Sequence, residues 1–228
     1  MTYQPTTRVW RYMSFAKLVW ILQKKQLWLS SIKLLDDKWE GMLNTQQLNS
    51  LNRPISLSRA ALKEAERLVK IYRETAFINC WNASEHESHA LWRIYCPSSE
   101  GVAIQTTLDR LRKSVDPLSV LEVSYDQQNE VNNKLYIAQK RSMFAYEQEV
   151  RIVHIEDFSD SQHAERITIG IAIDWDPELH IEKILVHPEA QSWFMETVTE
   201  TVRQLAPKLS RDGFLPVVWS ELSYSPPF

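Results

Sequence analysis

The sequence predicts an α+β fold, a single domain with a mixed or antiparallel central sheet and flanking helices. Strand-like segments outnumber long helical ones, and the two kinds do not alternate in the regular way that βαβ units require. The 228 residues include 4 glycines, with neither GxGxxG nor GxxxxGK[ST] among them. Folds that depend on a glycine-rich phosphate loop are therefore not supported.

The first 31 residues predict a strand, a helix and a strand. "RVWRYMSF" (8–15) mixes β-branched, aromatic and basic residues as a strand does, and Ser14 is a candidate helix cap. Residues 15–26 place apolar side chains at helical spacing. "LWLSS" (27–31) is a short strand that ends in two hydroxyls.

Residues 44–75 are predicted to form a loop-plus-helix insertion in one domain that spans residues 1–228. The polar stretch "NTQQLNSLNRP" precedes the clearest helix of the chain, residues 56–74, which is rich in alanine and carries charges at i,i+4 spacing.

The rest of the chain predicts strands and helices in irregular order. The expected strands cover residues 76–82, 101–107, 119–126, 149–155, 166–175, 181–187 and 214–222. The expected helices cover residues 87–95, 108–115, 132–148 and 188–206, the last with Pro188 in its first turn and an apolar stripe at Trp193, Phe194, Val198 and Val202.

Composition indicates an ordinary globular protein of the cytoplasm. The net charge of -3 predicts no polyanion-binding surface. Two cysteines are fewer than small secreted scaffolds use, which favours a reducing compartment. The N-terminus lacks the features of a signal peptide, and no apolar run reaches 18 residues, so no membrane partner is expected.

The stretch "YEQEVR" (146–151) carries the strongest candidate for chemistry. Glu147 and Glu149 are two residues apart, so in a strand they would share a face, and repulsion would raise the pKa of one of them. The alternative is a solvated strand edge on which Arg151 pairs with the glutamates.

Other candidates have equally simple structural interpretations. Arg11 lies in an apolar strand, where an arginine commonly pairs with a carboxylate. Ser30 and Ser31 could bind a ribose, but such a pair often ends a strand. Tyr12 could stack on a base, although alternating aromatics usually fill a core. Two cysteines and two histidines occur close together in the sequence: Cys80, His86, His89 and Cys96. Their spacing does not follow that of zinc sites, so no metal is expected.

Several short motifs in order resemble the bacterial domain-of-unknown-function family DUF2971. They are "WRYMS" (10–14), "LWLSS" (27–31), "LDDKWEG" (35–41), "CWNAS" (80–84), "LWRIY" (91–95), "GVAI" (101–104) and "YEQEVR" (146–151). The chain departs from the family pattern at three positions, since Lys38 replaces a proline, Asn82 a serine and Val150 a tryptophan. It is thus similar to a divergent member.

The arrangement also resembles, more distantly, that of ADP-ribosyltransferases, which implies an ADP-ribosyltransferase-like fold and NAD as the substrate. The resemblance implies that Arg11 grips the ribose or phosphate of NAD and that Glu149 stabilises the oxocarbenium-like ribose. The resemblance also implies that Glu147 occupies the position from which residues of those enzymes direct the acceptor. The remaining nucleotide-binding residues that it implies are Tyr12, Ser30, Ser31 and Asn82.

The leading hypothesis is therefore an NAD-dependent ADP-ribosyltransferase-like enzyme, a bacterial toxin or phage-defence effector, that modifies a protein or a nucleic acid or simply hydrolyses NAD. The alternative from a different class is a catalytically silent module that binds a nucleotide or a protein. A third possibility is a nucleic-acid-processing enzyme with Mg²⁺ held by four carboxylates: Asp36, Asp37, Glu147 and Glu149.

Overall fold

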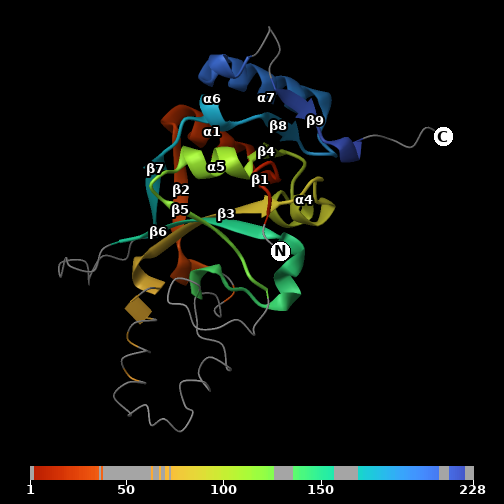
Figure 1. Ribbon diagram of the computed structural model, residues 1–228. Coiled ribbons are helices and arrows are strands. Elements are labelled where there is room, and N and C mark those ends of the chain that lie inside the picture. The colour runs from red at the N-terminus through yellow and green to blue at the C-terminus, as the bar shows by residue number, and fades with distance from the viewer. Residues whose placement is uncertain are drawn as a thin grey trace. The chain divides into compact units, whose positions relative to one another are not determined.

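The computed structural model of the chain forms two compact units (Figure 1). It describes residues 3–35, 37, 63, 67, 70–71, 73–125, 136–156, 169–210 and 216–223. Unit 1 comprises Met1–Leu27, Trp81–Pro117 and Ile173–Phe228, and unit 2 comprises Trp28–Cys80 and Leu118–Ala172. Neither unit is a continuous segment of the chain. Three of the four boundaries between the units fall inside a strand, and the fourth falls in the turn at residues 117–118.

Unit 1 contains a mixed sheet. Its strands are β1 (Arg8–Ser14), β4 (Gly101–Thr107), β8 (Lys183–Val186), β9 (Val217–Trp219) and the end of β3 (Ala76–Ala83). β1 is antiparallel to β4 along its full length and to the end of β3 on its other side. β4 is antiparallel to β8, whereas β8 and β9 are parallel.

Helices of unit 1 pack through apolar stripes. They are α1 (Phe15–Lys24), α4 (His89–Tyr95), α5 (Leu108–Ser114), α6 (Pro177–His180), α7 (Ser192–Leu205) and the 3₁₀ turns η5 (Pro207–Leu209) and η6 (Glu221–Ser223). The rings of Phe15 and Phe194 meet edge to face at 5.4 Å, which joins α1 to α7. Thr107 caps α5 by accepting a hydrogen bond from the amide of Arg110.

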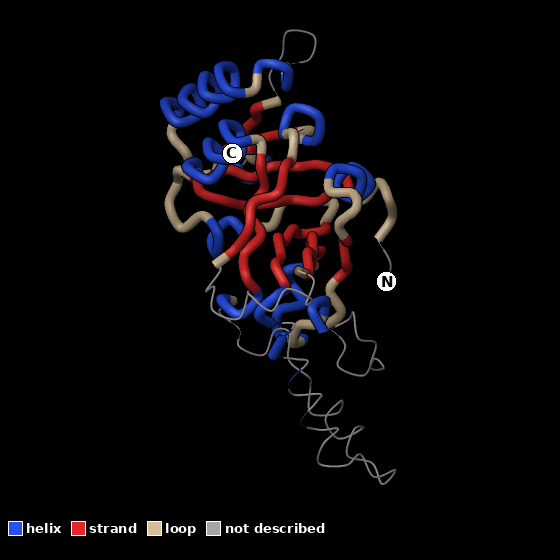
Figure 2. Tube along the Cα trace, turned by 90° about the vertical axis from the view of Figure 1, so that its left-hand side faces the viewer, coloured by secondary structure: helices blue, strands red, loops and turns tan. Residues whose placement is uncertain are grey.

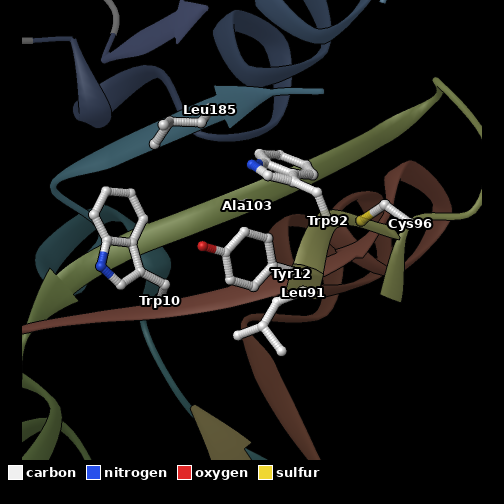
Figure 3. Close-up of a cluster of buried hydrophobic side chains, with 7 residues drawn as sticks. All are labelled: Trp10, Tyr12, Leu91, Trp92, Cys96, Ala103 and Leu185. Carbon is white, nitrogen blue, oxygen red and sulfur yellow. The ribbon is translucent and has the colours of Figure 1, made fainter. Parts of the chain in front are cut away.

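One face of the unit 1 sheet packs on α4 (Figure 3). Trp10 and Tyr12 lie on this face because side chains two residues apart in a strand point the same way. The Tyr12 ring meets Trp92 edge to face at 5.0 Å, and its hydroxyl accepts a hydrogen bond from the amide of Ser88 at 2.8 Å. The cluster excludes water from both aromatic side chains of β1.

Unit 2 contains two antiparallel strand pairs. Its strands are β5 (Ser119–Glu122), β6 (Glu149–Ile155) and most of β2 (Gln26–Ser31), β3 and β7 (Gly170–Asp174); its 3₁₀ turns are η1 (Ile32–Leu34), η2 (Tyr136–Ala138) and η3 (Ser142–Glu147). β5 pairs with β6, β6 neighbours β3, and β3 pairs with β2. A buried apolar cluster covers one face: Ile32, Ala76, Ile78, Ile137 and Val153.

The α+β class and the mixed sheet are confirmed, because β1 is antiparallel to β3 and β4, β4 to β8 and β5 to β6, whereas β8 and β9 are parallel. Figure 2 shows the strands together with the helices around them. All nine predicted strands exist: β4 and β6 have the predicted bounds, and the other seven differ from the prediction at one or both ends. The described residues of the predicted 56–74 helix are all helical: Lys63, Arg67, Lys70, Ile71, Arg73 and Glu74. Most of the 44–75 insertion lies outside the described residues. The single domain over residues 1–228 stays a prediction.

Two predicted helices are wrong in extent. Residues 132–148 do not form one helix; their described part forms η2 and η3, separated by a β-bridge from Gln139 to Ser124. The 188–206 helix begins only at Ser192, since a turn follows His187 and the Glu189 amide donates to the His187 ring. Trp193, expected in the apolar stripe, is 53% exposed.

The helix α6 was not predicted. It has four residues, with Asp176 as its cap and Pro177 at its first position, and is too short for periodicity to reveal. None of the helices in the described part of the chain has the length and apolar character that crossing a membrane takes.

Candidate active site

The two candidate glutamates lie in unit 2, one on each side of a tight turn. Glu147 ends η3 and Glu149 begins β6, while Gln148 between them takes a left-handed conformation with φ 42°. The predicted start of the strand at residue 149 is confirmed, so the two glutamates do not lie in one strand and do not share a strand face. Both side chains are nevertheless buried, at 8% and 4% exposure, so the alternative of a solvated strand edge is also wrong.

Arg151 grips Glu149 with two parallel hydrogen bonds. Its Nε donates to Oε1 at 2.7 Å and its Nη2 to Oε2 at 2.9 Å, the planar fork that suits a carboxylate. Its Nη1 donates to the carbonyl of Ile137 at 2.7 Å. Since Arg151 is 0% exposed, this is a fully buried ion pair.

Lys140 joins the two glutamates. Its Nζ donates to Glu147 Oε2 at 2.5 Å and lies 3.4 Å from Glu149 Oε2. The same ammonium lies over the ring of Phe144, 4.8 Å from the centroid. The lysine side chain is 8% exposed, so its charge is offset by these neighbours rather than by bulk water.

Glu149 is held as a carboxylate. Burial alone would raise its pKa, but the charge and hydrogen bonds of Arg151, the charge of Lys140 and a hydrogen bond from the Cys80 thiol outweigh burial. The net effect lowers the pKa of Glu149 to about 2. Repulsion from Glu147 therefore does not raise the pKa of Glu149, because cations surround it.

The backbone of Glu149 is fixed as firmly as its side chain. Its amide donates to the Tyr125 hydroxyl at 2.9 Å, and its carbonyl accepts from the amide of Val123 at 2.9 Å. Burial raises the pKa of Tyr125. The phenol of Tyr125 therefore stays protonated at neutral pH. Its contact with the Glu149 amide fixes the backbone, while Arg151 fixes the carboxylate.

The hydroxyls of Ser30 and Ser31 point to opposite faces of the unit 2 strands. Ser30 pairs with Ile78, so it lies on the face of the apolar cluster, which Ile78 shares with Cys80 in alternate positions of β3. The Cys80 thiol donates to Glu149, so Ser30 and Glu149 share this face. Ser31 lies on the other face and is 0% exposed.

The Mg²⁺ hypothesis loses one of its carboxylates. Asp37 accepts two hydrogen bonds from Arg141, at 3.1 Å from Nε and 3.0 Å from Nη2, which makes it a structural partner. Asp36 lies outside the described residues. Within the described ranges, no three histidine, cysteine, aspartate or glutamate residues are grouped as a metal site requires.

The predicted nucleotide-binding residues of unit 1 divide between two faces of its sheet. Asn82 is opposite Trp10 in the β1–β3 register, so it shares a face with Trp10 and Tyr12, and it is 5% exposed. Arg11 points to the opposite face, is half-buried and is level with Ile104 of β4. The binding roles of Arg11, Tyr12 and Asn82 stay predictions.

The zinc candidates do not act as a set in unit 1. His86 and His89 are exposed, whereas Cys96 is buried and its thiol donates to the carbonyl of Met13 at 3.3 Å. Burial raises the pKa of Cys96 to about 11, so its sulfur is a protonated thiol at neutral pH.

Sequence reasoning missed Lys140, Tyr125 and Cys80 as members of the site. The basic pair Lys140–Arg141 precedes the glutamates, but it lies inside the predicted 132–148 helix and belongs to none of the motifs. Tyr125 falls within the predicted 119–126 strand, and Cys80 is considered only with the zinc candidates. Each reaches the glutamates only through the tertiary packing of unit 2.

No protein-family model matches the chain, and no curated protein matches it. The resemblance to DUF2971 therefore stays a prediction.

The chain is similar to solved structures of DarT from Thermus sp. 2.9. For the complex with NAD⁺, the identity is 15% over 98% of this chain and 100% of that chain, with a TM-score of 0.47. For the complex with ADP-ribosylated ssDNA, the identity is 15% over 97% of both chains, with a TM-score of 0.45. For the complex with carba-NAD⁺, the identity is 14% over 96% of this chain and 98% of that chain, with a TM-score of 0.44.

Proposed function

We propose that the chain is an NAD-dependent ADP-ribosyltransferase-like enzyme in which Glu149 is the catalytic carboxylate. The observation that carries this proposal is the state of Glu149. It is a buried carboxylate, ionised at neutral pH and held in one orientation by Arg151 and by its own backbone contacts. The ordered motifs that end in "YEQEVR" also support it.

The chemistry needs such a group. When the bond between nicotinamide N1 and ribose C1′ breaks, the electron pair leaves with nicotinamide and positive charge develops on the ribose. A fixed carboxylate stabilises that charge more in the transition state than in the bound substrate. An acceptor nucleophile, or water, then forms the new bond to C1′ and loses its proton.

Other residues have supporting roles in this proposal. Glu147 shares Lys140 with Glu149 and would direct the acceptor. Ser30 shares the face of Glu149 and would bind the ribose, while Arg11, Tyr12 and Asn82 are the further nucleotide-binding residues that the resemblance implies. Ser31 faces the other way and has no binding role in this proposal. NAD is the substrate, and the acceptor is a protein, a nucleic acid or water. A bacterial toxin or phage-defence effector is the setting that the resemblance implies.

A catalytically silent binding module is the second candidate, and one observation favours it. Both oxygens of Glu149 already accept hydrogen bonds from Arg151, and Lys140 adds a third cationic contact. A carboxylate so fully engaged can act purely as a structural anchor for β6 and η2. The two candidates differ in whether nicotinamide is released.

The test is release of labelled nicotinamide from NAD by the purified full chain, without acceptor and with added protein or single-stranded DNA. Three proteins are compared: wild type, E149Q and E189Q. Glu189 is the matched control, because it also pairs with an arginine, Arg93, but at the surface with 55% exposure. We expect E149Q to lower turnover at least about 100-fold and E189Q to match wild type.

A second variant separates catalysis from folding. E149D keeps the charge but withdraws the carboxylate by one methylene, so it should fold and still lose turnover. Nucleotide binding without nicotinamide release in wild type would favour the silent module. Turnover in E149Q equal to that of wild type would remove Glu149 from the mechanism.

A further inference from the structure

We propose that Lys140 is a positioning residue, whose ammonium group holds Glu147 and Glu149 beside each other as a pair of carboxylates. Its consequence for turnover rests on the proposed function. No motif in the sequence includes this lysine.

Burial and contacts set Lys140 apart from the other lysines with a described ion pair. Its side chain is 8% exposed, whereas those of Lys25 and Lys113 are 48% and 73% exposed. Its Nζ contacts one oxygen of each glutamate, at 2.5 Å and 3.4 Å. Its own amide is fixed by a hydrogen bond to the carbonyl of Ser124 at 3.1 Å.

The division of labour between the two buried cations follows from their contacts. Arg151 binds Glu149 through two nitrogens and directs a third to the Ile137 carbonyl, so its charge is aimed at Glu149. Lys140 contacts both carboxylates, with the shorter contact to Glu147. Two cations thus face two anions, and the group is neutral as a whole.

Loss of Lys140 would leave two carboxylates and one arginine in a buried space. Two negative charges at such a short distance repel each other, which disfavours ionisation of both carboxyl groups. Glu147 and Glu149 together would therefore retain a proton up to a higher pH. Among the described residues, the other ionisable groups that contact this centre do not replace the lost charge. Cys80 and Tyr125 donate to Glu149 or accept from it as neutral groups, and Arg141 pairs with Asp37.

The first test compares three variants in nicotinamide release as a function of pH. K140M removes the charge and keeps the length of the side chain, K140R keeps a charge, and K113M is the matched control, an exposed lysine paired with Asp109 at 2.7 Å. We expect K140M to move the acid limb of the profile upward by about one pH unit or more and to lower kcat more than it raises KM for NAD. K140R should restore most of the wild-type profile.

K113M should leave the profile unchanged. A K140M protein that melts cooperatively and shows the wild-type pH profile would overturn the proposal. A K140R protein that folds but is as impaired as K140M would also overturn it, because charge would then not be what matters.

The second test does not depend on turnover, so it distinguishes failure of this inference from failure of the proposed function. The side-chain ammonium of Lys140 is observed by NMR in protein labelled with ¹⁵N-lysine and assigned by its loss in K140R. We expect a signal protected from water exchange, and we expect E147Q to weaken that protection. An ammonium signal that exchanges as fast as that of Lys113 would refute the role of Lys140, whether or not wild type releases nicotinamide.

Discussion

Replacing Arg151 with methionine tests the buried ion pair on which the candidate site depends. The change removes the three hydrogen bonds that Arg151 donates to Glu149 and to Ile137. Glu149, at 4% exposure, then keeps its charge without its main partner. Breaking a buried ion pair on one side costs about 3–5 kcal/mol of unfolding free energy, and we expect a loss of that size at pH 7.

The dependence on pH gives the test a second dimension. In wild type the folded pKa of Glu149, about 2, lies below its ordinary value of 4.5. Its stabilisation is therefore complete above pH 4.5 and is lost as the pH falls through 2. The full effect is roughly 3 kcal/mol, of which about 2 kcal/mol is lost between pH 7 and pH 3.

In R151M this acid-sensitive contribution should vanish or change sign, because burial, which raises the pKa of Glu149, is then opposed chiefly by Lys140. Urea unfolding at pH 7 and pH 3, followed by circular dichroism, measures both effects. R93M is the control: it removes an arginine from an exposed pair with Glu189 and should cost less than about 1 kcal/mol. An R151M protein within about 1 kcal/mol of wild type at pH 7, with an unchanged difference between the two pH values, would refute the reasoning.

Two further predictions concern Ser31 and His187. The Ser31 hydroxyl is buried and has no hydrogen-bond partner in the described ranges, so S31A should raise the unfolding free energy by up to about 1 kcal/mol. Because Ser31 lies on the face opposite Glu149, S31A should leave KM for NAD unchanged, whereas S30A should raise it. A larger increase of KM in S31A than in S30A would contradict this assignment. Burial lowers the pKa of His187, which packs edge to face on Trp92 at 5.2 Å. The stability that the neutral form of His187 contributes is complete above pH 6.5 and is lost as the pH falls below 6.5. The urea midpoint of H187F should therefore change less between pH 7.5 and pH 5.5 than that of wild type. An equal change of the two midpoints would contradict this prediction.

Local pattern was a sufficient guide where the side chains of an element repeat with the period of its backbone. The alternation of "GVAIQTT" predicted β4, and the helical spacing of residues 15–26 predicted α1, which buries Leu18, Ile21 and Leu22. The helix α1 contacts the core through one face, whereas β4 is buried on both faces over residues 101–106. In each case the side-chain pattern follows the backbone period, so the sequence carries it directly. The α+β class followed from the order of such segments.

Pattern failed where a partner distant in sequence overrides local preference. Residues 136–147 have helical spacing, yet Gln139 forms a bridge with Ser124 and the chain breaks into two 3₁₀ turns. That break turns Lys140 toward Glu147 and Glu149. In a continuous helix over these residues, Lys140 would instead have the position that regular helical spacing gives it.

The sequence by itself determined that two glutamates and an arginine stand within five residues of each other, and that strand spacing would allow Arg151 to face Glu149. Tertiary structure decided what these groups are: a neutral, buried assembly completed by Lys140, with the pKa of Glu149 lowered rather than raised. The reason is physical. Charge in a buried site depends on every neighbour within a few ångströms, and those neighbours come from segments that only folding brings together.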